Sequence, residues 1–501
     1  MRRGRLALLL ALAALALPAA PAAAAAPACP ASHWVAAWTA APTDAATGGV
    51  QDQTLRQVVV PHGAGDRARL RLSNRFGAEP LTVDRTTIGR RAGGGGAAVE
   101  PGTLVPVTFG GRAAVTIPPG GEVVSDPIPI AVAPLRPLLV STYFASGTGP
   151  LTEHYYARQV PHIASGDRTG EASGEGFDAL DRTSAYVVAG LDVLAPGSVG
   201  AVVAFGDSLT DGYVGAPRPG EAGAEAIGAD GAYPDALQRR LLGAKGAPPL
   251  VVVNAGISGN RILDDGLIPE HGRSMLARLH VDALALPGVT TVILQGGAND
   301  LGAGEPDAGR VIAGLADLVA RARAAGKRVL LATMTPAEGA RPASYGDAAA
   351  EAARAAVNAW IRSGAAGDDV GIVDFDAALR DPARPGRLRP ELDSGDGLHP
   401  NLAGYRAMAE AVDLALLAAP ACACRVRPAL RVRVPARLRG RLRSAVVTVD
   451  GRRVGTIRRP GQSVRVDLRR ARGSQVVIRM RIRLSGGRTV TRVQRLPRCL
   501  A

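Results

Sequence analysis

Aromatic side chains are scarce in this sequence. Phe, Trp and Tyr together make up 3% of the 501 residues, although 47% of the residues are hydrophobic. A core in this chain must therefore be built mainly from Ala, Val, Leu and Ile. The length suggests roughly two to four domains, and the many Gly and Pro residues indicate frequent turns.

Cysteine is also sparse, and the central part of the chain contains none. No two of the four cysteines have the spacing of a zinc-binding C-x-x-C pair, so neither a thiol nucleophile nor such a metal site is expected. In an exported protein an even number of cysteines suggests disulfides. Among the three connectivities that four cysteines allow, we expect Cys424–Cys499, which brackets the C-terminal segment, with Cys29–Cys422 as the second.

A long hydrophobic run occurs only near the N-terminus. Three arginines within the first five residues precede an apolar stretch at 6–17, which is shorter than a membrane span and is followed by small residues suited to cleavage. We therefore expect residues 1–26 to be a signal peptide and the protein to be secreted, with no membrane span after cleavage. Lipoprotein anchoring at Cys29 is disfavoured because Pro27 interrupts the run of small residues.

Acidic residues are nearly absent from the C-terminal segment. From residue 425 to the end there are 23 arginines and two acids, Asp450 and Asp467. This segment therefore carries +21, and since the whole chain carries +15, the rest carries −6. The arginines alternate with apolar residues, as in 479–484, which is the pattern of a sheet with one solvated face. We expect loose attraction to anionic envelope polymers, not nucleic-acid binding.

The hydrophobic pattern changes twice along the chain and indicates three folded units. Between 33 and 197, short alternating runs such as Ala68–Leu72 are separated by Gly and Pro clusters, which predicts an N-terminal β-sandwich module. Between 198 and 420, apolar runs alternate with helical stretches, which predicts an α/β domain with a parallel sheet. From 425 to 501 the pattern is again strand-like and predicts a small basic Ig-like β-sandwich.

Two sets of elements are expected within the α/β domain. The apolar runs expected as strands are Ala201–Phe205, Leu250–Val253, Thr291–Leu294, Val329–Ala332 and Gly371–Val373. The amphipathic stretches expected as helices are Val311–Ala325, Glu351–Ile361 and Ala403–Leu417.

A serine follows the first apolar run of this domain, in Gly206-Asp207-Ser208-Leu209. Sites in open parallel sheets form beyond the carboxyl ends of the strands, and Gly206 lets the backbone turn sharply. Ser208 can therefore expose its hydroxyl at the start of the next helix. The segment alone is equally compatible with Ser208 as a helix N-cap.

A serine nucleophile needs a base, which is usually a histidine. Of the seven histidines, only His399 has a carboxylate three residues before it, Asp396, in the segment Asp-Gly-Leu-His-Pro. Asp396 can accept a hydrogen bond from one ring nitrogen while the other nitrogen faces the serine, which fixes the tautomer. The alternative is an ordinary loop histidine before Pro400.

Acyl transfer also needs hydrogen-bond donors for the developing oxyanion. Gly256, in Asn-Ala-Gly after the second apolar run, can present its backbone N–H. Asn299, in Gly-Gly-Ala-Asn-Asp after the third run, can present its side-chain amide. Each segment alone is an ordinary Gly-Asn turn, but neighbouring parallel strands end side by side, so together the turns predict one site.

The four segments resemble blocks I, II, III and V of the SGNH (GDSL-type) hydrolase family, in that family's order, over about residues 199–417. The resemblance implies a flavodoxin-like α/β fold and a serine esterase that hydrolyses carboxylic esters. It makes Ser208 the nucleophile, His399 the general base and Asp396 the residue that orients it. The G-x-S-x-G elbow of the other common esterase fold is absent.

The same resemblance implies an oxyanion hole made of the Ser208 N–H, the Gly256 N–H and the Asn299 amide. The β-rich segment upstream, which begins with Trp34 and Trp38, resembles the N-terminal module of a secreted bacterial subgroup of this family. The C-terminal segment lies outside the resemblance.

The expected substrates are short-chain acyl or acetyl esters, including esters on polysaccharides, because export and a β-rich module accompany the α/β domain. A long-chain lipase or acylhydrolase is the alternative within the same chemistry. A catalytically silent carbohydrate- or cell-wall-binding protein is the alternative of another class. No cofactor or metal is expected, since no H-E-x-x-H or similar ligand cluster occurs.

Overall fold

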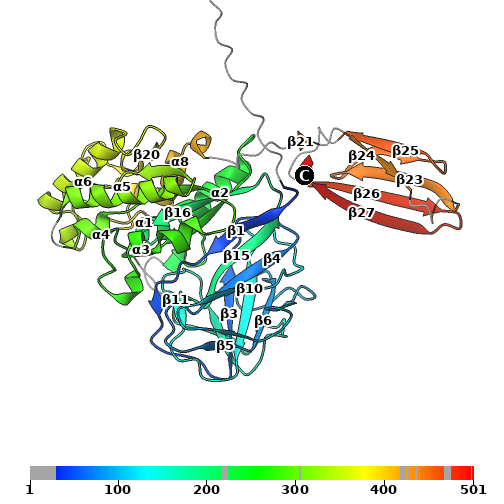
Figure 1. Ribbon diagram of the computed structural model, residues 1–501, viewed down its shortest axis with the longest axis horizontal. Helices are drawn as coiled ribbons and strands as arrows, with labels where there is room; N and C mark the ends of the chain where they lie inside the picture. The colour runs from blue at the N-terminus through cyan, green and yellow to red at the C-terminus, as the bar shows by residue number, and fades with distance from the viewer. Residues whose placement is uncertain are drawn as a thin grey trace, which may run out of the picture.

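The computed structural model describes residues 30–215, 224–303, 306–417, 425–426, 429–434, 438, 440–467, 475–497 and 499–500. The expected signal peptide lies outside these ranges, and so does at least one cysteine of each expected disulfide. Figure 1 shows three parts: a β unit in blue to cyan, an α/β unit in green to yellow and a β unit in orange to red. Among the described residues, none of the helices combines the length and apolar character of a membrane span.

The N-terminal β unit is built of antiparallel strands, so the β-rich character predicted for this segment is confirmed. Its two larger sheets have the orders β1-β15-β4-β9 and β13-β12-β3-β10-β6-β7, and two smaller sheets have the orders β14-β11-β2 and β5-β8. The strands are β1 (His33–Thr39), β2 (Asp44–Ala45), β3 (Gln53–Val59), β4 (Ala68–Ser73), β5 (Leu81–Val83), β6 (Arg85–Arg90), β7 (Val105–Val107), β8 (Val115–Ile117), β9 (Glu122–Val124), β10 (Leu138–Phe144), β11 (Thr152–His154), β12 (His162–Ser165), β13 (Asp178–Ala179), β14 (Ala185–Tyr186) and β15 (Val188–Ala195).

The α/β unit contains a sheet of five parallel strands in the order β17-β16-β18-β19-β20. The strands are β16 (Gly200–Gly206), β17 (Leu250–Gly256), β18 (Val289–Leu294), β19 (Arg328–Ala332) and β20 (Gly371–Val373). Counted along the chain, this order is 2-1-3-4-5, which is the flavodoxin-like arrangement. The predicted parallel sheet is confirmed, and each of the five apolar runs lies within one strand.

Helices cover both faces of this sheet. They are α1 (Ser208–Asp211), α2 (Tyr233–Gly243), α3 (Met275–Leu279), α4 (Ala298–Leu301), α5 (Ala308–Ala324), α6 (Ala348–Arg362), α7 (Phe375–Leu379) and α8 (Leu402–Ala411). The helix expected to continue to Leu417 ends at Ala411, because Asp413 accepts a hydrogen bond from the Ala415 N–H and begins a separate 3-10 turn at Leu414–Leu416.

Alternate residues of β16 point into two different hydrophobic cores. Val203 and Phe205 belong to the core that includes α3, α5 and α6, whereas Val202 and Ala204 belong to the core that includes α2, α7 and α8. A strand that is buried on both faces has a nearly continuous apolar sequence, which explains why β16 was recognisable in the sequence as an uninterrupted run.

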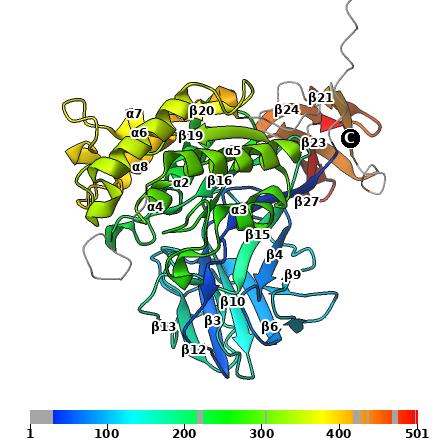
Figure 2. The ribbon, with the colours of Figure 1, turned by 60° about the vertical axis from the view of Figure 1, so that its left-hand side comes forward.

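The N-terminal β unit packs directly against the α/β unit, as Figures 1 and 2 show. The first of the two cores continues from β16 into strands of the N-terminal β unit. Backbone groups of the two units also pair, since the Ala36 N–H donates to the Pro287 carbonyl at 2.9 Å. The His62 Nδ1 lies 2.6 Å from the Val252 carbonyl oxygen. The two units therefore share one interior.

The C-terminal β unit has a core of its own, made of Val, Ile, Leu, Ala and Met side chains. Its main sheet has the order β24-β23-β26-β27, and β22 pairs with β25 and β21 with β28. The strands are β21 (Arg425–Val426), β22 (Ala429–Arg433), β23 (Leu442–Val449), β24 (Arg452–Ile457), β25 (Ser463–Asp467), β26 (Gln475–Leu484), β27 (Thr489–Pro497) and β28 (Cys499–Leu500).

Candidate active site

Ser208 begins helix α1 directly beyond the carboxyl end of β16. Asp207, not Ser208, is the N-cap, because its side chain accepts a hydrogen bond from the Leu209 N–H at 3.0 Å. Gly206 is required at the turn, since a Cβ there would lie 2.2 Å from the Thr210 hydroxyl oxygen. The capping role considered for Ser208 is thus taken by its neighbour, and the Ser208 hydroxyl is left for other chemistry.

His399 and Asp396 lie on the loop that precedes α8. Gly395 and Gly397 adopt left-handed conformations with φ of 106° and 76°, which lets the loop fold tightly around Asp396. The Asp396 Oδ1 accepts hydrogen bonds from the backbone N–H groups of Leu398 and His399 at 2.9 and 2.8 Å. The carboxylate is therefore fixed by its own loop before it meets the histidine ring.

The three predicted catalytic residues form one hydrogen-bonded chain, although 191 residues separate Ser208 from His399. The Ser208 Oγ lies 2.9 Å from the His399 Nε2, and the His399 Nδ1 lies 2.6 Å from the Asp396 Oδ2. Burial tends to raise the pKa of Asp396, but hydrogen bonds from His399 and the backbone outweigh it and lower the pKa to about 2. Asp396 is therefore an anion that can hold the Nδ1–H tautomer.

Asn299 lies in the first turn of α4, beyond the carboxyl end of β18. Its Oδ1 accepts a hydrogen bond from the Tyr345 hydroxyl at 2.9 Å, and its Nδ2 donates to the Asn260 carbonyl at 2.9 Å. These two bonds fix the orientation of the amide, and among the described residues no acceptor is found for the second Nδ2 hydrogen. Tyr345 was not predicted from the sequence, since it lies in a 3-10 turn without a recognisable motif.

The Gly256 N–H is not offered to a substrate in this structure. It donates to the Asn254 Oδ1 at 2.9 Å, and the Gly256 Cα packs against the backbone of α1, where a Cβ would lie 2.2 Å from the Asp211 nitrogen. The expectation that Gly256 supplies an oxyanion donor is therefore corrected, because a side-chain oxygen already accepts its N–H and the residue serves close packing of β17 against α1.

Gly259, three residues further on, has the properties expected for Gly256. Among the described residues no acceptor is found for its N–H. It lies between Ser258, whose hydroxyl donates to the Asp211 Oδ2 at 2.6 Å, and Asn260, whose carbonyl accepts from Asn299. Its φ of 76° favours glycine, and a Cβ there would lie 2.2 Å from the His271 ring. Gly259 therefore lies between the segments that hold Ser208 and Asn299.

A buried arginine connects the strand ends behind the site. The Arg278 Nη2 and Nη1 donate to the carbonyls of Gly206 and Ala255 at 2.7 and 2.8 Å, and the Nε donates to the Asn260 Oδ1 at 2.8 Å. Burial lowers the pKa of Arg278 to about 10, so the side chain remains charged at neutral pH. One side chain from α3 thus fixes the ends of β16 and β17, and no sequence pattern had indicated it.

The N-terminal β unit makes an ionic contact with helix α1. The His154 Nε2 lies 3.3 Å from the Asp211 Oδ1, and the Arg158 Nη2 lies 3.4 Å from the Asp211 Oδ2. Burial tends to raise the pKa of Asp211, but the charges of Arg158 and His154 outweigh it and lower the pKa. The helix that carries Ser208 is therefore held in place by residues of the N-terminal β unit.

Three tyrosines form a wall beside the catalytic histidine. The Tyr213 ring meets the His399 ring edge-on with centroids 4.7 Å apart, Tyr156 lies 5.5 Å from Tyr213, and Tyr155 lies 4.6 Å from Tyr156. Tyr155 and Tyr156 directly follow β11, whereas Tyr213 follows α1. The N-terminal β unit therefore contributes part of the surroundings of the site.

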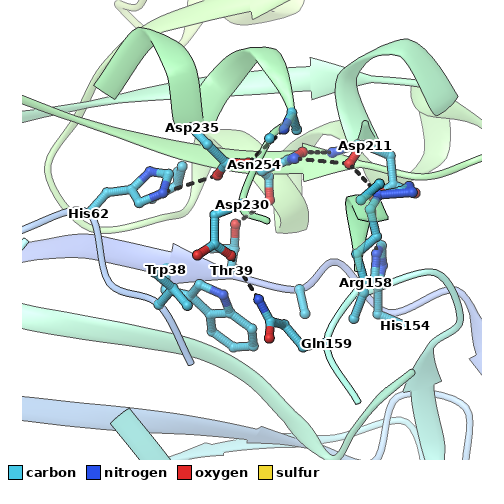
Figure 3. A pocket seen from close by; sticks show the side chains of 18 residues that line it. Trp38, Thr39, His62, His154, Arg158, Gln159, Asp211, Asp230, Asp235 and Asn254 are labelled. Atoms are coloured by element: carbon cyan, nitrogen blue, oxygen red, sulfur yellow. Dashed lines mark hydrogen bonds and ion pairs between the residues drawn. The ribbon is translucent and has the colours of Figure 1, made fainter. Parts of the chain in front are cut away.

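A small cavity of about 90 Å³ lies between the two units and is lined by residues of both. Figure 3 shows His62 and Asp235 paired at one end and Arg158, His154 and Asp211 at the other. Burial, together with the charge of Asp235, raises the pKa of Asp230, a further lining residue, to about 6. The polar groups of the cavity pair mostly with one another, which is consistent with a structural contact between the units.

A comparison with protein-family models matches residues 204–407 to the GDSL-like lipase/acylhydrolase family. The match covers most of the α/β unit and leaves both β units outside it. The resemblance inferred from the four sequence segments is therefore confirmed, and the matched range includes Ser208, Asn299 and His399. A search of curated proteins gave no match.

Several solved structures are similar to part of this chain. They include a GDSL-like lipase from Bacteroides thetaiotaomicron VPI-5482, with 20% identity, a TM-score of 0.32 and coverage of 43% of this chain and 87% of that chain. A carbohydrate acetylesterase family member from Sinorhizobium meliloti has 20% identity and a TM-score of 0.32, covering 42% and 94%. The aryl esterase of M. smegmatis has 19% identity and a TM-score of 0.32, covering 42% and 95%.

Proposed function

We propose that the protein is a serine esterase that hydrolyses carboxylic esters through an acyl-enzyme. The observation that carries the proposal is the continuous chain from the Ser208 Oγ through the His399 ring to the Asp396 carboxylate, at 2.9 and 2.6 Å. A protein that only bound carbohydrate or cell wall would not need a nucleophile, a base and an anion at these distances. The geometry therefore favours catalysis over the silent binding protein.

In the proposed reaction the Ser208 Oγ attacks the ester carbonyl carbon while its proton passes to the His399 Nε2. The protonated histidine then gives this proton to the departing alcohol oxygen as the ester C–O bond breaks. A water molecule, deprotonated by His399, then attacks the acyl carbon; the bond from this carbon to the Ser208 Oγ breaks, the acid is released, and His399 returns the proton to the Oγ. Asp396 stays ionised throughout and stabilises the imidazolium.

We infer that three donors stabilise the oxyanion: the N–H of Ser208, the N–H of Gly259 and the Nδ2 of Asn299. The N–H of Ser208 is the first of its helix and has no acceptor within α1. The Asn299 amide is already oriented by Tyr345 and Asn260, so its placement costs little when the oxyanion develops.

Replacement of Asn299 by alanine is expected to lower kcat by roughly 10²- to 10³-fold, which is the range for one lost oxyanion donor. Tyr345→Phe, which removes only the bond that orients the amide, should lower kcat less than about tenfold. Turnover of p-nitrophenyl acetate under saturating conditions measures both. Equal effects of the two substitutions would argue against a direct role for the Asn299 amide.

The kcat/KM for p-nitrophenyl acetate is expected to fall about tenfold per pH unit on the acid side, because protonated His399 cannot accept the serine proton. Protonation of Asp396 does not add a second decline of kcat/KM in this pH range. Since its pKa is lowered to about 2, its charge, and the stability that depends on it, is lost only as the pH falls toward that value. A rate profile that stays flat down to about pH 4 would contradict the role of His399.

The preferred substrates of the proposed enzyme are acetyl or short-chain acyl esters, including those on polysaccharides, and a long-chain acylhydrolase is the alternative. Hydrolysis of p-nitrophenyl esters from acetate to palmitate distinguishes the two. We expect activity that falls steeply beyond butyrate. A maximum at the long chains would assign the protein to the lipase alternative, and no activity on any ester would overturn the esterase proposal.

A further inference from the structure

A hollow in the surface of the N-terminal β unit begins at the tyrosine wall. It has a volume of about 360 Å³ and is lined by three tyrosines, Tyr155, Tyr156 and Tyr186, and by the segment 180–184. Tyr156 also contacts Tyr213, whose ring contacts His399, so two ring contacts separate the hollow from the catalytic histidine. The tyrosine wall therefore connects the hollow with the catalytic histidine.

The lining of the hollow is aromatic and polar, with little aliphatic surface. Leu180 is its only aliphatic side chain, and Asp181, Arg182, Thr183 and Ser184 supply charged and hydroxyl groups. The Ser184 hydroxyl donates to the Tyr155 carbonyl at 2.9 Å, which ties the segment to the tyrosines. Tyrosine rings offer apolar faces with a polar tip, whereas a long acyl chain requires a mostly apolar groove.

We propose that this hollow is a glycosyl subsite, in which the N-terminal β unit binds the sugar on the alcohol side of the ester. The inference rests on the proposed esterase function and gives it a substrate class. A sugar ring has apolar C–H faces that pack on the tyrosine rings and hydroxyl edges that can pair with Asp181 and Arg182. In this arrangement the α/β unit performs the chemistry and the N-terminal β unit selects the alcohol.

The test compares two acetate esters, glucose pentaacetate and p-nitrophenyl acetate, and measures the ratio of their kcat/KM values. Tyr156→Ala and Arg182→Ala are each expected to lower the ratio of sugar to phenyl ester at least about tenfold, as expected when a binding contact outside the reacting group is lost. Arg136→Ala is the matched control, because Arg136 is also an exposed arginine of the N-terminal β unit but lies outside the hollow.

A ratio that stays at the wild-type value in both variants would overturn the glycosyl subsite, even if phenyl ester hydrolysis is normal. A fall that is equally large in Arg136→Ala would also overturn it. If the variants instead lower the preference among p-nitrophenyl esters of longer acyl chains, the hollow binds the acyl group and the inference is wrong. Absence of wild-type activity on both acetates would count against the esterase itself, so the two failures are distinguishable.

A second inference comes from an independent feature, a row of arginines on β26. Arg479, Arg481 and Arg483 are exposed, and the residues between them belong to the core of the C-terminal β unit. Since side chains alternate across a strand, the three guanidinium groups lie on one outer face. Within the described part of the chain no carboxylate pairs with any of them, so three like charges lie next to one another without a compensating charge.

The neighbours of this row leave it accessible. On the neighbouring strands β23 and β27, Val446 and Thr491 lie opposite Arg481, and Ser444 and Thr489 lie opposite Arg483. These short side chains do not cover the guanidinium groups. Residues 425–501 contain no Phe, Trp or Tyr, so the face has no aromatic platform on which nucleic-acid bases could stack.

We infer that this arginine row binds an anionic polysaccharide, with its charges placed along the strand. The probe is fluorescein-labelled heparin, and the assay is fluorescence polarisation on the full chain at several salt concentrations. Substitution of Arg479, Arg481 and Arg483 by serine is expected to weaken binding at least about tenfold, since each arginine near an anionic surface contributes attraction. The slope of log Kd against log salt should become shallower.

The control variant replaces three other exposed arginines of the same unit by serine, namely Arg452, Arg458 and Arg459, and so removes the same charge. Retained heparin affinity in this control, with loss in the β26 variant, supports the row as the site. Equal loss in both variants would overturn it, because the attraction would then depend only on net charge. Tighter binding of a single-stranded oligonucleotide than of heparin would overturn the choice of polysaccharide.

Discussion

Ser208→Ala is expected to lower kcat for p-nitrophenyl acetate by roughly 10⁴- to 10⁶-fold, the range seen when a triad nucleophile is removed. The Ser208 hydroxyl has one described partner, the His399 Nε2 at 2.9 Å. Without the Oγ no acyl-enzyme can form, whereas Asp207 still caps α1 and Gly206 still forms the turn. The loss of activity should therefore occur without loss of the fold.

Steady-state hydrolysis measures the rate, and thermal unfolding followed by circular dichroism reports on the fold. Ser363→Ala is a suitable control, because Ser363 is an exposed serine at the end of α6, where its hydroxyl donates to the Trp360 carbonyl. This variant should keep wild-type turnover. A Ser208→Ala protein that retained wild-type turnover would refute the assignment of the nucleophile.

Asp396→Asn is the second large effect, with an expected fall in kcat of roughly 10⁴-fold. In the native site the Asp396 Oδ2 accepts from the His399 Nδ1, which leaves the Nε2 lone pair facing Ser208. Asparagine can keep an oxygen toward the Leu398 and His399 N–H groups, which places its NH₂ group against Nδ1. The ring would then carry its proton on Nε2 and could not act as base.

Asp393→Asn is the matched control for this substitution. Asp393 lies on the same loop, and its Oδ1 accepts the N–H groups of Gly395 and Gly397 at 2.8 and 3.1 Å. An amide oxygen can accept the same two hydrogen bonds, so the control should keep kcat within about threefold of wild type. A small decrease is still allowed for, because a neutral acceptor replaces a charged one. An Asp396→Asn enzyme with kcat within tenfold of wild type would show that the tautomer of His399 does not depend on this carboxylate.

The sequence predicted those parts of the molecule in which a short local pattern corresponds to a single kind of structure. A strand buried on both faces is a continuous apolar run, and the five runs became β16 to β20. The loops beyond such strands carry the chemistry, so Ser208 and Asn299 could be recognised where β16 and β18 end. The spacing of Asp396 and His399 also has a direct meaning, because the bond between them is formed within one short loop.

Other features depend on the relative positions of distant segments, which the sequence pattern does not encode. Gly256 is the last residue of β17 and Gly259 lies three residues beyond it, and what distinguishes the two is the hydrogen bond of the Gly256 N–H to the Asn254 side chain. Arg278 and Tyr345 act through backbone and amide groups of segments that are close only after folding. Tyr156 of the N-terminal β unit contacts Tyr213, which contacts His399, so this arrangement depends on how the two units pack.

Covalent labelling of the protein by a fluorophosphonate, followed by mass spectrometry of its peptides, tests directly whether Ser208 is the nucleophile. We expect one phosphonyl adduct on Ser208 in the wild-type protein and none in Ser208→Ala, because the serine paired with His399 is the activated one. An adduct on another serine, or a wild-type protein that remains unlabelled while folded, would contradict the assignment of Ser208 as the nucleophile.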